Sequence, residues 1–538
     1  MVDRYMSQIK LLDCTLRDGG FVNDWNFGHG DIINIFERLV SAKVDIIEVG
    51  FLDDRRPFDI NRTILPDTEA VNRVFRDIRK RPPMVVGMID YGTCTLENVC
   101  DCADSFLDGI RVIFKKKDAV EALAFCRAIQ EKGYKVFVQP VSVTGYSDQE
   151  LSELVDRVNE LEPYSMSVVD TYGLLHKNNL FHYFQLLNDR LLPSVGVGYH
   201  SHNNFQLAYS NSIELMGLKI DRLLVIDGSV YGMGKGAGNA NLELLAMYMN
   251  DHCGKDYDIN QMLEIIDVNI MQIFLKTPWG YSMRYYLAAL NDCHPMYVQY
   301  LLQKRTLSTK SVNEILRRLR DEERLAFNEA HVEELYRLYQ TRDIDDGKAI
   351  AALGELLRGQ EVLILGPGKS VMECNGDIAD FAAKTCPKVI AINYLPKGVA
   401  ADYVFVSNGK RYVPLSNQLA SAGTRARTIA TSNVACVDGE FDFTVDYSKL
   451  LDPDFFIIDN SLLMLLKLLA QFGVGKVALA GFDGYRANAA GCNYLDMAME
   501  YSFSEEKAAK VNSFVVESLK EMRKKMEIRF VTPSLYEV

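Results

Sequence analysis

Two histidines separated by a single residue, His200 and His202, end an apolar run and form the clearest metal-binding pattern in the chain. In an extended strand, residues i and i+2 leave the same face about 7 Å apart at the backbone. Both imidazoles can therefore reach one ion, and imidazole is a good ligand for zinc, manganese, cobalt or iron. Asp18, which follows another apolar run, is the predicted third ligand, because a carboxylate completes a mixed nitrogen and oxygen set. The alternative is a hydrogen-bonded histidine pair without metal.

Arg17, directly before Asp18, is the candidate for stabilising negative charge in a reaction. Its guanidinium stays protonated at any physiological pH, so it can bind an enolate oxygen as that oxygen becomes negative. A buried arginine needs a counter-charge, and Glu48, at the end of the next apolar run, is expected to supply it. Asn239, near the end of the glycine-rich segment 232–240, is expected to be a neutral oxygen ligand or a group that orients the ligands.

These residues need a scaffold that brings the ends of distant strands together. Short apolar runs alternate with longer amphipathic stretches up to about residue 230, which is typical of βα units around a parallel sheet. Eight such strands with helical connections predict a TIM (β/α)8 barrel, and an open doubly wound sheet is the weaker alternative. The expected strands are Ile9–Asp13, Val44–Phe51, Met84–Asp90, Gly109–Phe114, Tyr134–Val141, Met166–Asp170, Val195–His202 and Arg222–Gly228.

Polar residues and glycines gather at the carboxyl ends of these runs, which is where a barrel places its active site. Besides the residues already named, Gln139, Thr171 and Asn204 stand at or just beyond such ends. They are expected to contact the substrate. A divalent cation is the expected cofactor, with Mn²⁺ or Mg²⁺ preferred and Zn²⁺ or Co²⁺ as alternatives.

Length and composition set the limits of the function. The chain has 538 residues, of which 48% are hydrophobic and 24% charged, so we expect a globular protein of more than one domain. A formal net charge of -13 argues against nucleic acid or an anionic membrane as a partner. The 11 cysteines are scattered along the chain, so we expect reduced thiols. Because no apolar segment is long enough to span a membrane and the amino terminus has no signal-peptide pattern, we expect a cytoplasmic location. Homo-oligomer formation is left open.

The rest of the chain divides into a helical part and a second alternating region. We expect a barrel over residues 1–245, a helical appendage over 246–345 and a Rossmann-like α/β domain over 346–538. The last domain opens with a strand that enters a glycine turn, and its candidate phosphate-binding residues are Gly366, Gly368, Lys369 and Ser370. The turn has neither Walker spacing nor the dinucleotide fingerprint, which argues against a classical ATPase and against a nicotinamide cofactor.

The first half of the chain contains four motifs: LDCTLRDG (12–19), EVGF (48–51), GYHSHNN (198–204) and GKGAGN (234–239). Together they resemble the motifs of the DRE-TIM metallolyases, the group that includes hydroxymethylglutaryl-CoA lyase and 4-hydroxy-2-oxovalerate aldolase. The aldolase branch is the nearest in its eighth-strand loop, residues 227–234. The resemblance implies that Asp18, His200 and His202 bind the metal with Asn239 as a ligand or neighbour, and that Tyr285 reaches the active site.

The sequence departs from that family at the proton-transfer group. Where the aldolase branch has a histidine base three residues after the metal aspartate, this chain has Phe21, and where the lyases have a loop cysteine it has Val230. Proton transfer must therefore come from another group or from a metal-bound water. The other candidates are Tyr285, Asp24, His29 and Tyr146.

The predicted function is a metal-dependent carbon–carbon lyase or aldolase that acts on a small 2-oxo acid through an enolate, with an aldehyde or acyl partner. The last domain resembles Rossmann-like pterin pyrophosphokinase-like and sialyltransferase-like folds, which implies a phosphorylated or nucleotide-linked ligand. The alternatives are a synthase that condenses the oxo acid with an acyl-CoA, a bifunctional protein with a carboxyl-terminal transferase, and a scaffold without activity.

Overall fold

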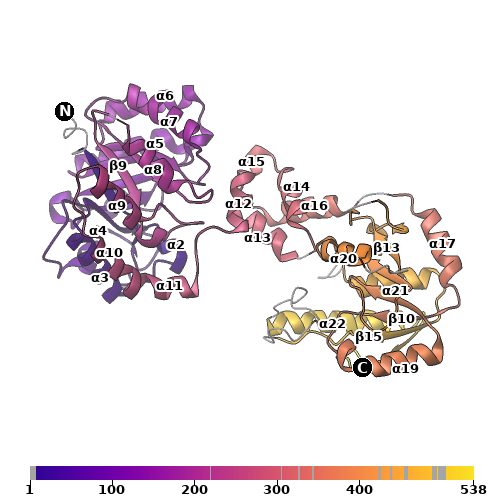
Figure 1. Ribbon diagram of the computed structural model, residues 1–538. Helices are drawn as coiled ribbons and strands as arrows, with labels where there is room; N and C mark the ends of the chain where they lie inside the picture. The colour runs from indigo at the N-terminus through magenta and orange to yellow at the C-terminus, as the bar shows by residue number, and fades with distance from the viewer. Residues whose placement is uncertain are drawn as a thin grey trace. The chain divides into compact units, whose positions relative to one another are not determined.

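The computed structural model describes residues 8–537, except 219, 305, 325–326, 342–343, 422–425, 437–438, 453–458, 488–493 and 495–503. The chain forms two compact units, Met1–Pro295 and Met296–Val538 (Figure 1). The boundary between them falls inside the expected helical appendage, and the three-part division stays a prediction.

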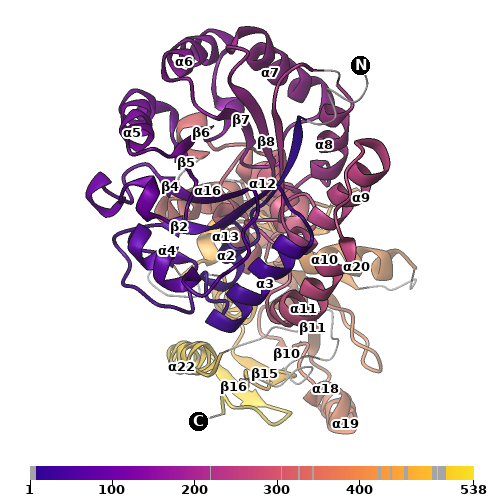
Figure 2. The same ribbon diagram turned by 90° about the vertical axis from the view of Figure 1, so that its left-hand side faces the viewer.

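The first unit is a closed barrel of eight parallel strands, as the sequence predicts. β1 pairs with both β9 and β2, which closes the sheet, and a short strand β3 (Ile64–Leu65) extends it beside β2. Figure 2 shows helices surrounding these strands. The barrel strands are β1 (Ile9–Asp13), β2 (Ile46–Leu52), β4 (Met84–Asp90), β5 (Gly109–Phe114), β6 (Lys135–Pro140), β7 (Ser165–Asp170), β8 (Gly196–Ser201) and β9 (Leu224–Gly228).

The apolar pattern explains why this unit closes. Every residue of β2 is buried, as expected for a strand that is covered on both faces. Leu12, Ile46 and Val225 fill the barrel interior together with side chains of other strands. Outside the strands, α3 (His29–Ser41) buries Ile32, Ile35, Phe36 and Leu39, which is the spacing of one helix face.

The helices of the first unit follow the strands in order. They are α2 (Gly20–Asn23), α3, α4 (Thr68–Phe75), α5 (Ala119–Glu131), α6 (Asp148–Leu161), α7 (Lys177–Arg190), α8 (Ala208–Met216), α9 (Leu242–His252), α10 (Ile259–Ile265), the π-helix η6 (Ile266–Ile270), α11 (Met271–Lys276) and α12 (Met283–Leu290). Short 3-10 turns η1 to η5 lie in the loops, at Leu96–Asn98, Cys102–Asp104, Lys116–Asp118, Val143–Gly145 and Val230–Gly232.

A bulge interrupts β2 next to the barrel mouth. The pairing of β2 with β4 shifts register between Glu48 and Phe51. Gly50 lies in this irregularity with φ +152°, and a Cβ built there would come within 1.9 Å of the carbonyl oxygen of Thr63. Only glycine fits this position, because an added side chain would collide with the backbone of the next segment.

The second unit contains a parallel sheet with helices on both faces. Its strand order is β14-β13-β12-β11-β10-β15-β16, so the order reverses between β10 and β15. The predicted mixed α/β class is confirmed. One core joins α17, α21 and α22 to one face of the sheet, and another places α18 and α19 against the other face.

The strands of this unit are β10 (Glu361–Leu365), β11 (Lys388–Ile392), β12 (Tyr403–Val406), β13 (Arg427–Thr431), β14 (Phe443–Val445), β15 (Lys476–Ala480) and β16 (Glu527–Phe530). The helices are α13 (Pro295–Lys304), α14 (Thr309–Leu316), α15 (Asp321–Arg324), α16 (Glu329–Gln340), α17 (Gly347–Leu357), α18 (Ser370–Glu373), α19 (Asn375–Thr385), α20 (Gly409–Ser421), α21 (Ser461–Gln471) and α22 (Glu505–Met522), with a 3-10 turn η7 (Ser448–Leu450). After the strand that opens this domain, the sequence predicts strands over residues 388–393, 403–407, 455–459, 476–480 and 528–531. The range 455–459 lies outside the described residues except for Asp459, and the sequence does not predict β13 and β14. Among the described helices, none has both the length and the apolar character needed to cross a membrane.

Gly198 offers a test of how closely the barrel strands pack. It pairs in register with Ser167 of β7, and a Cβ built on Gly198 would lie 2.1 Å from the Ser167 hydroxyl oxygen. Gly198→Ala should therefore lower the free energy of unfolding by about 1–3 kcal/mol because it overpacks the interior. Ser167→Ala alone should cost roughly 1 kcal/mol, because it removes the acceptor of the Gln139 amide.

The double variant should lose less stability than the sum of the two single variants, because Ser167→Ala removes the colliding oxygen. Urea unfolding followed by circular dichroism measures the three losses. Strictly additive losses would show that the two positions do not collide.

Candidate metal centre

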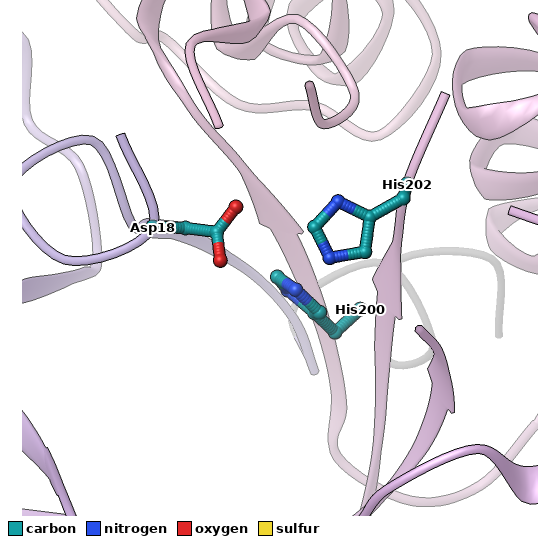
Figure 3. A group of neighbouring side chains, drawn as sticks. All are labelled: Asp18, His200 and His202. Carbon is teal, nitrogen blue, oxygen red and sulfur yellow. The ribbon is translucent and has the colours of Figure 1, made fainter. Parts of the chain in front are cut away.

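Asp18, His200 and His202 converge at the carboxyl end of the barrel (Figure 3). One ligand atom from each lies within 4.8 Å of the others, and all three side chains are buried. His200 belongs to β8, His202 follows that strand, and Asp18 lies in the turn after β1. Within the described parts of the chain, this is the only such group of three acidic, histidine or cysteine side chains.

Backbone contacts hold Asp18 in place. The N–H of Asp18 donates to the Cys14 carbonyl at 2.8 Å, and the N–H of Cys14 donates to Gly228 of β9 at 2.8 Å. From above, the N–H of Lys235 donates to Asp18 Oδ2 at 3.0 Å. The carboxylate is therefore fixed between the first strand and the loop that follows the last one.

Asn239 also contacts the carboxylate of Asp18. Its Nδ2 donates to Asp18 Oδ2 at 2.9 Å, and its backbone forms an isolated antiparallel bridge with His202. Gly234 allows this approach, because a Cβ there would lie 2.4 Å from Asn239 Nδ2 and 2.5 Å from Asp18 Oδ2.

The donor set fits a divalent cation. Asn239 Oδ1 and His202 Nδ1 are buried and have no hydrogen-bond partner among the described residues. A buried polar atom without a partner costs about 1–3 kcal/mol, and a cation among these groups would offset part of that cost. Carboxylate oxygen, amide oxygen and neutral imidazole are also ligand types that divalent metals accept.

The protonation states agree with this fit. Burial raises the pKa of Asp18, but Arg17 and then the two imidazoles outweigh it, so the pKa lies below its ordinary value. Burial lowers the pKa of His202 to about 4, against a smaller opposing effect of Asp18. At neutral pH the aspartate is therefore ionised and His202 is neutral, which are the forms that bind metal.

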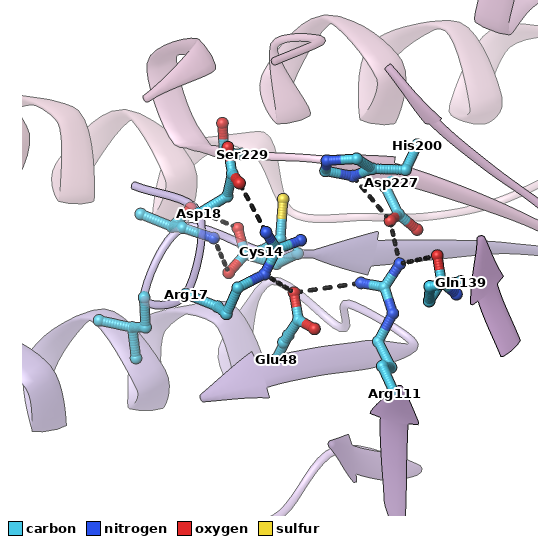
Figure 4. A network of polar contacts seen from close by, with 12 residues as sticks. Cys14, Arg17, Asp18, Glu48, Arg111, Gln139, His200, Asp227 and Ser229 are labelled. Carbon is cyan, nitrogen blue, oxygen red and sulfur yellow. Dashed lines mark hydrogen bonds and ion pairs between the residues drawn. The ribbon is translucent and has the colours of Figure 1, made fainter. Parts of the chain in front are cut away.

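A buried ionic network supports the cluster from below (Figure 4). Arg17 Nη1 lies 2.5 Å from Asp18 Oδ1, and Arg17 Nε lies 2.7 Å from Glu48 Oε2. Burial disfavours the charge on Arg17, but Glu48 and Asp18 reverse the effect and raise its pKa. Arg17 Nη2 is buried and has no partner among the described residues, so one donor of the guanidinium is left over.

The same network continues across the barrel to the histidines. Arg111 Nη1 lies 3.1 Å from Glu48 Oε2, and Arg111 Nη2 pairs with Asp227 Oδ2. Asp227 Oδ2 in turn lies 3.0 Å from His200 Nδ1. A carboxylate on one imidazole nitrogen fixes the tautomer and orients the other nitrogen, and this leaves His200 Nε2 for a metal.

Sequence reasoning missed the roles of Arg111 and Asp227. A signal existed for Arg111, because it is the single charged residue in the strand GIRVIF, which is buried on both faces. An isolated charge in such a strand indicates a buried partner. Asp227 is visible in the sequence only as a polar residue at the end of the predicted strand Arg222–Gly228.

The three residues expected to contact substrate have different surroundings. Gln139 lies inside the barrel, where its Nε2 donates to Ser167 at 2.8 Å. Thr171 Oγ1 accepts the N–H of Ser142 at 2.9 Å, and Asn204 Oδ1 accepts the N–H of Ala237 at 3.4 Å. Thr171 and Asn204 thus also position loops at the mouth. Substrate contact stays a prediction for all three.

Tyr285 lies beside the loop that covers Asp18. A Cβ built on Gly236 would be 3.8 Å from the Tyr285 ring. The tyrosine is positioned by α12, whose N-cap residue Ser282 accepts the N–H of Tyr285 through its hydroxyl. The helix after the barrel therefore brings Tyr285 to this loop, and a catalytic role stays a prediction.

The position expected for a base carries an aromatic ring. Phe21 is 42% exposed, its ring packs edge-on against Trp25 at 4.8 Å and Phe51 at 6.0 Å between centroids, and Lys235 Nζ lies 5.3 Å from its centroid. A phenyl ring cannot transfer a proton.

The other expected proton-transfer groups are engaged differently. Asp24 pairs with Arg56 and Arg62 near the surface, whereas His29 Nε2 lies 3.1 Å from the Val74 carbonyl in the outer helix layer. The Tyr146 hydroxyl is buried and has no partner among the described residues.

In the second unit, an internal carboxylate lies against the glycine turn. The N–H of Ser370 donates to Asp483 Oδ2 at 3.0 Å, and the Ser370 hydroxyl donates to Asp483 Oδ1. A Cβ built on Gly368 would lie 2.6 Å from Asp483 Oδ1, and one on Gly366 would lie 2.7 Å from the Phe482 ring. The glycines thus make room for the loop after β15, and the phosphate role of this turn, including Lys369, stays a prediction.

Comparisons with known proteins assign the barrel to a protein family. The HMGL-like family model matches residues 8–268. A 4-hydroxy-2-oxovalerate aldolase from Shewanella woodyi is 32% identical over 254 residues, which are 44% of this chain and 69% of that protein. The chain belongs to the HMGL-like family. The predicted resemblance to the DRE-TIM metallolyases is thereby confirmed for the barrel.

Other relatives match the HMGL-like barrel over a similar length. An oxaloacetate decarboxylase from Mycobacterium tuberculosis is 28% identical over 239 residues, 44% of this chain and 68% of that protein. Among solved structures, the N-terminal domain of a candidate aldolase from Bacteroides vulgatus is 26% identical with a TM-score of 0.49, and the match covers 58% of this chain and 100% of that one. The HMGL-like match includes Asp18, His200, His202 and Asn239, and it ends before Tyr285.

Removal of one ligand tests the centre directly. His200→Ala should lower Mn²⁺ affinity roughly 100-fold, because it removes one of the two imidazole ligands together with the contact by which Asp227 orients it. Isothermal titration calorimetry on protein freed of metal measures this change. His182→Ala is the matched control, because His182 pairs with Asp148 on the surface of α7. Equal Mn²⁺ affinity in His200→Ala and the control would refute the ligand set.

Proposed function

We propose that this protein is a divalent-metal-dependent lyase or aldolase that acts on a small 2-oxo acid through an enolate. The observation that carries the proposal is the placement of Arg17 beside the ligand cluster, with Nη1 on Asp18 and Nη2 left as a buried donor without a partner. The names of two relatives, oxaloacetate decarboxylase and 4-hydroxy-2-oxovalerate aldolase, have an oxo acid in common and support the substrate class.

Asp18, His200 and His202 would hold the cation, with Asn239 as the fourth protein group. When bound, a divalent cation polarises the carbonyl of a 2-oxo acid and so eases formation of an enolate. Arg17 donates to the enolate oxygen as it becomes negative, and Glu48 keeps the guanidinium in position. Because the site is buried, these charges act in a medium of low polarity, where they are stronger than in water.

The phenylalanine at position 21 favours a second candidate reaction on the same site. Cleavage of a 4-hydroxy-2-oxo acid requires a group that removes the hydroxyl proton, and Phe21 stands where the aldolase branch has its histidine. Loss of CO2 from a 2-oxo acid with a 3-carboxylate requires no such base, because the electron pair of the breaking bond passes directly into the enolate. Decarboxylation of an oxaloacetate-like acid is therefore the second candidate.

Several finer points remain proposals. Mn²⁺ or Mg²⁺ is proposed from the mixed ligand set, with Zn²⁺ or Co²⁺ as alternatives. An acyl-CoA-condensing synthase and a bifunctional protein with a carboxyl-terminal transferase are the remaining alternatives, and product analysis with pyruvate plus acetyl-CoA tests the first. Binding of a phosphorylated or nucleotide-linked ligand by the second unit is independent of this reaction.

Arg17 can be tested without knowledge of the co-substrate. The exchange of pyruvate methyl protons with deuterated water, followed by proton NMR, reports formation of the enolate, in which the methyl proton passes to water or to a titratable group of the site such as Tyr285. Arg17→Gln should slow the metal-dependent exchange by about 10²- to 10³-fold, because it removes the donor to the enolate oxygen.

Arg17→Lys keeps the charge but loses the planar fork, so it should be intermediate. Arg190→Gln, which alters a surface pair with Asp156, should exchange like the unaltered protein. Wild-type exchange rates in both Arg17 variants would contradict the assigned role.

Substitution of Phe21 distinguishes between decarboxylation and aldol cleavage. The unaltered protein should decarboxylate oxaloacetate faster than it cleaves 4-hydroxy-2-oxopentanoate, because only the second substrate requires a base. Phe21→His should raise aldol cleavage by about 10²-fold or more and leave decarboxylation within a few-fold. Coupled assays of pyruvate release measure both rates. Faster aldol cleavage by the unaltered protein, with no gain in Phe21→His, would show that another base acts.

A further inference from the structure

A cavity of about 550 Å³ opens in the second unit at the carboxyl ends of its parallel strands. Gly368, Asn393, Asn408 and Gly481 line it from the loops after β10, β11, β12 and β15. In open α/β sheets, ligands bind outside the carboxyl ends where the strand order reverses, and here the order reverses between β10 and β15. The volume lies within the range of small-molecule sites.

Hydrogen bonds from Asn393 and Ser407 leave the hydroxyl of Ser461 as a donor at this cavity. Asn393, with φ +59°, donates from Nδ2 to Ser461 Oγ at 3.1 Å, and Ser407 Oγ donates to the same oxygen at 2.7 Å. Both lone pairs of Ser461 Oγ are therefore in use, and its own proton has no acceptor among the described residues. Ser461 lines the cavity, so this proton is available to an acceptor that enters it.

Charged side chains of both signs line the cavity. Three cationic side chains line it, those of Lys304, Arg411 and Lys507, against two carboxylates, those of Asp459 and Asp483. Lys304 is already paired with Glu333 at 2.5 Å.

The two carboxylates are compensated within the protein. Both oxygens of Asp483 accept hydrogen bonds from Ser370. Burial raises the pKa of Asp459, whose Oδ2 accepts the hydroxyls of Tyr336 and Tyr447 at 3.2 Å each. Both carboxylates are thus hydrogen-bonded within the protein.

Two helices also begin at the cavity wall. α20 follows Asn408 and α21 follows Asn460, and both asparagines line the cavity. The amino-terminal end of a helix carries a partial positive charge, which favours an anion. Phe482 and Tyr485 line the wall as well and provide aromatic surface for the rest of a ligand.

We propose that this cavity binds a phosphate-bearing small molecule, with the phosphate against Ser461 and Arg411. The phosphate is assigned to Ser461 and Arg411 and not to the glycine turn 366–370, which also borders the cavity but where Asp483 already lies against the N–H of Ser370. The proposal does not depend on the reaction of the barrel.

Calorimetry on the full chain tests the proposal with four probes: inorganic phosphate, ribose 5-phosphate, uridine 5′-monophosphate and uridine. At least one organic phosphate should bind more tightly than inorganic phosphate and more tightly than uridine. Preference for the nucleotide over the sugar phosphate, or the reverse, identifies the source of the phosphate. No binding of any phosphate-bearing probe at millimolar concentration would overturn the proposal.

Matched variants locate the site. Ser461→Ala and Arg411→Ala should each weaken binding about 10- to 100-fold, because hydrogen bonds to charged groups contribute roughly 1.5–3 kcal/mol. Ser461→Thr should retain affinity because it keeps the hydroxyl. Ser416→Ala on α20 and Arg427→Ala at the amino end of β13 are the controls.

His200→Ala separates this proposal from the function of the barrel. It should leave phosphate binding unchanged, whereas Ser461→Ala should leave pyruvate proton exchange unchanged. Unaltered thermal midpoints show that each variant is folded. Affinity that is lost in His200→Ala and retained in both Ser461→Ala and Arg411→Ala would assign the phosphate to the barrel and overturn the proposal.

Discussion

The ion pair between Arg17 and Glu48 is the interaction on which the metal centre depends. Arg17, Arg111, Asp18, Glu48 and Asp227 are all buried and connected, so two positive and three negative side chains leave one net negative charge inside the barrel. A buried excess charge is costly. A divalent cation would change the balance to one positive charge, and a singly charged carboxylate would then neutralise it. The proposed substrate class therefore agrees with the electrostatic balance of the buried network.

Much of the barrel could be predicted from the sequence because its signals are local. Apolar runs marked the strands, and polar residues at their carboxyl ends marked the mouth. The histidine pair is readable for the same reason, since residues two apart in a strand must share a face. Asp18 was predictable only through the fold, because the closing of the sheet brings the turn after β1 toward β8.

The parts that could not be predicted depend on side chains that are distant in sequence. Arg111 joins Glu48 to Asp227, and neither partner is near it in the chain. The carboxylate beside the glycine turn comes from Asp483, 113 residues beyond Ser370. The strands β13 and β14 have five and three residues, too few for a clear periodicity. The base cannot be named from the sequence, because Phe21 removes the family's usual group.

The bulge at Gly50 has a consequence for how the barrel mouth can change. Because the register shifts between Glu48 and Phe51, one strand supplies the partner of Arg17 and, three residues later, an aromatic ring 5.6 Å from the same guanidinium. The Thr63 carbonyl accepts the N–H of Phe51 at 2.9 Å and closes the space above Gly50. The backbone on this side of the mouth therefore has little room to change. Adaptation to a larger or smaller substrate would therefore use other loops of the mouth, such as those after β6 and β7, which carry Tyr146 and Thr171.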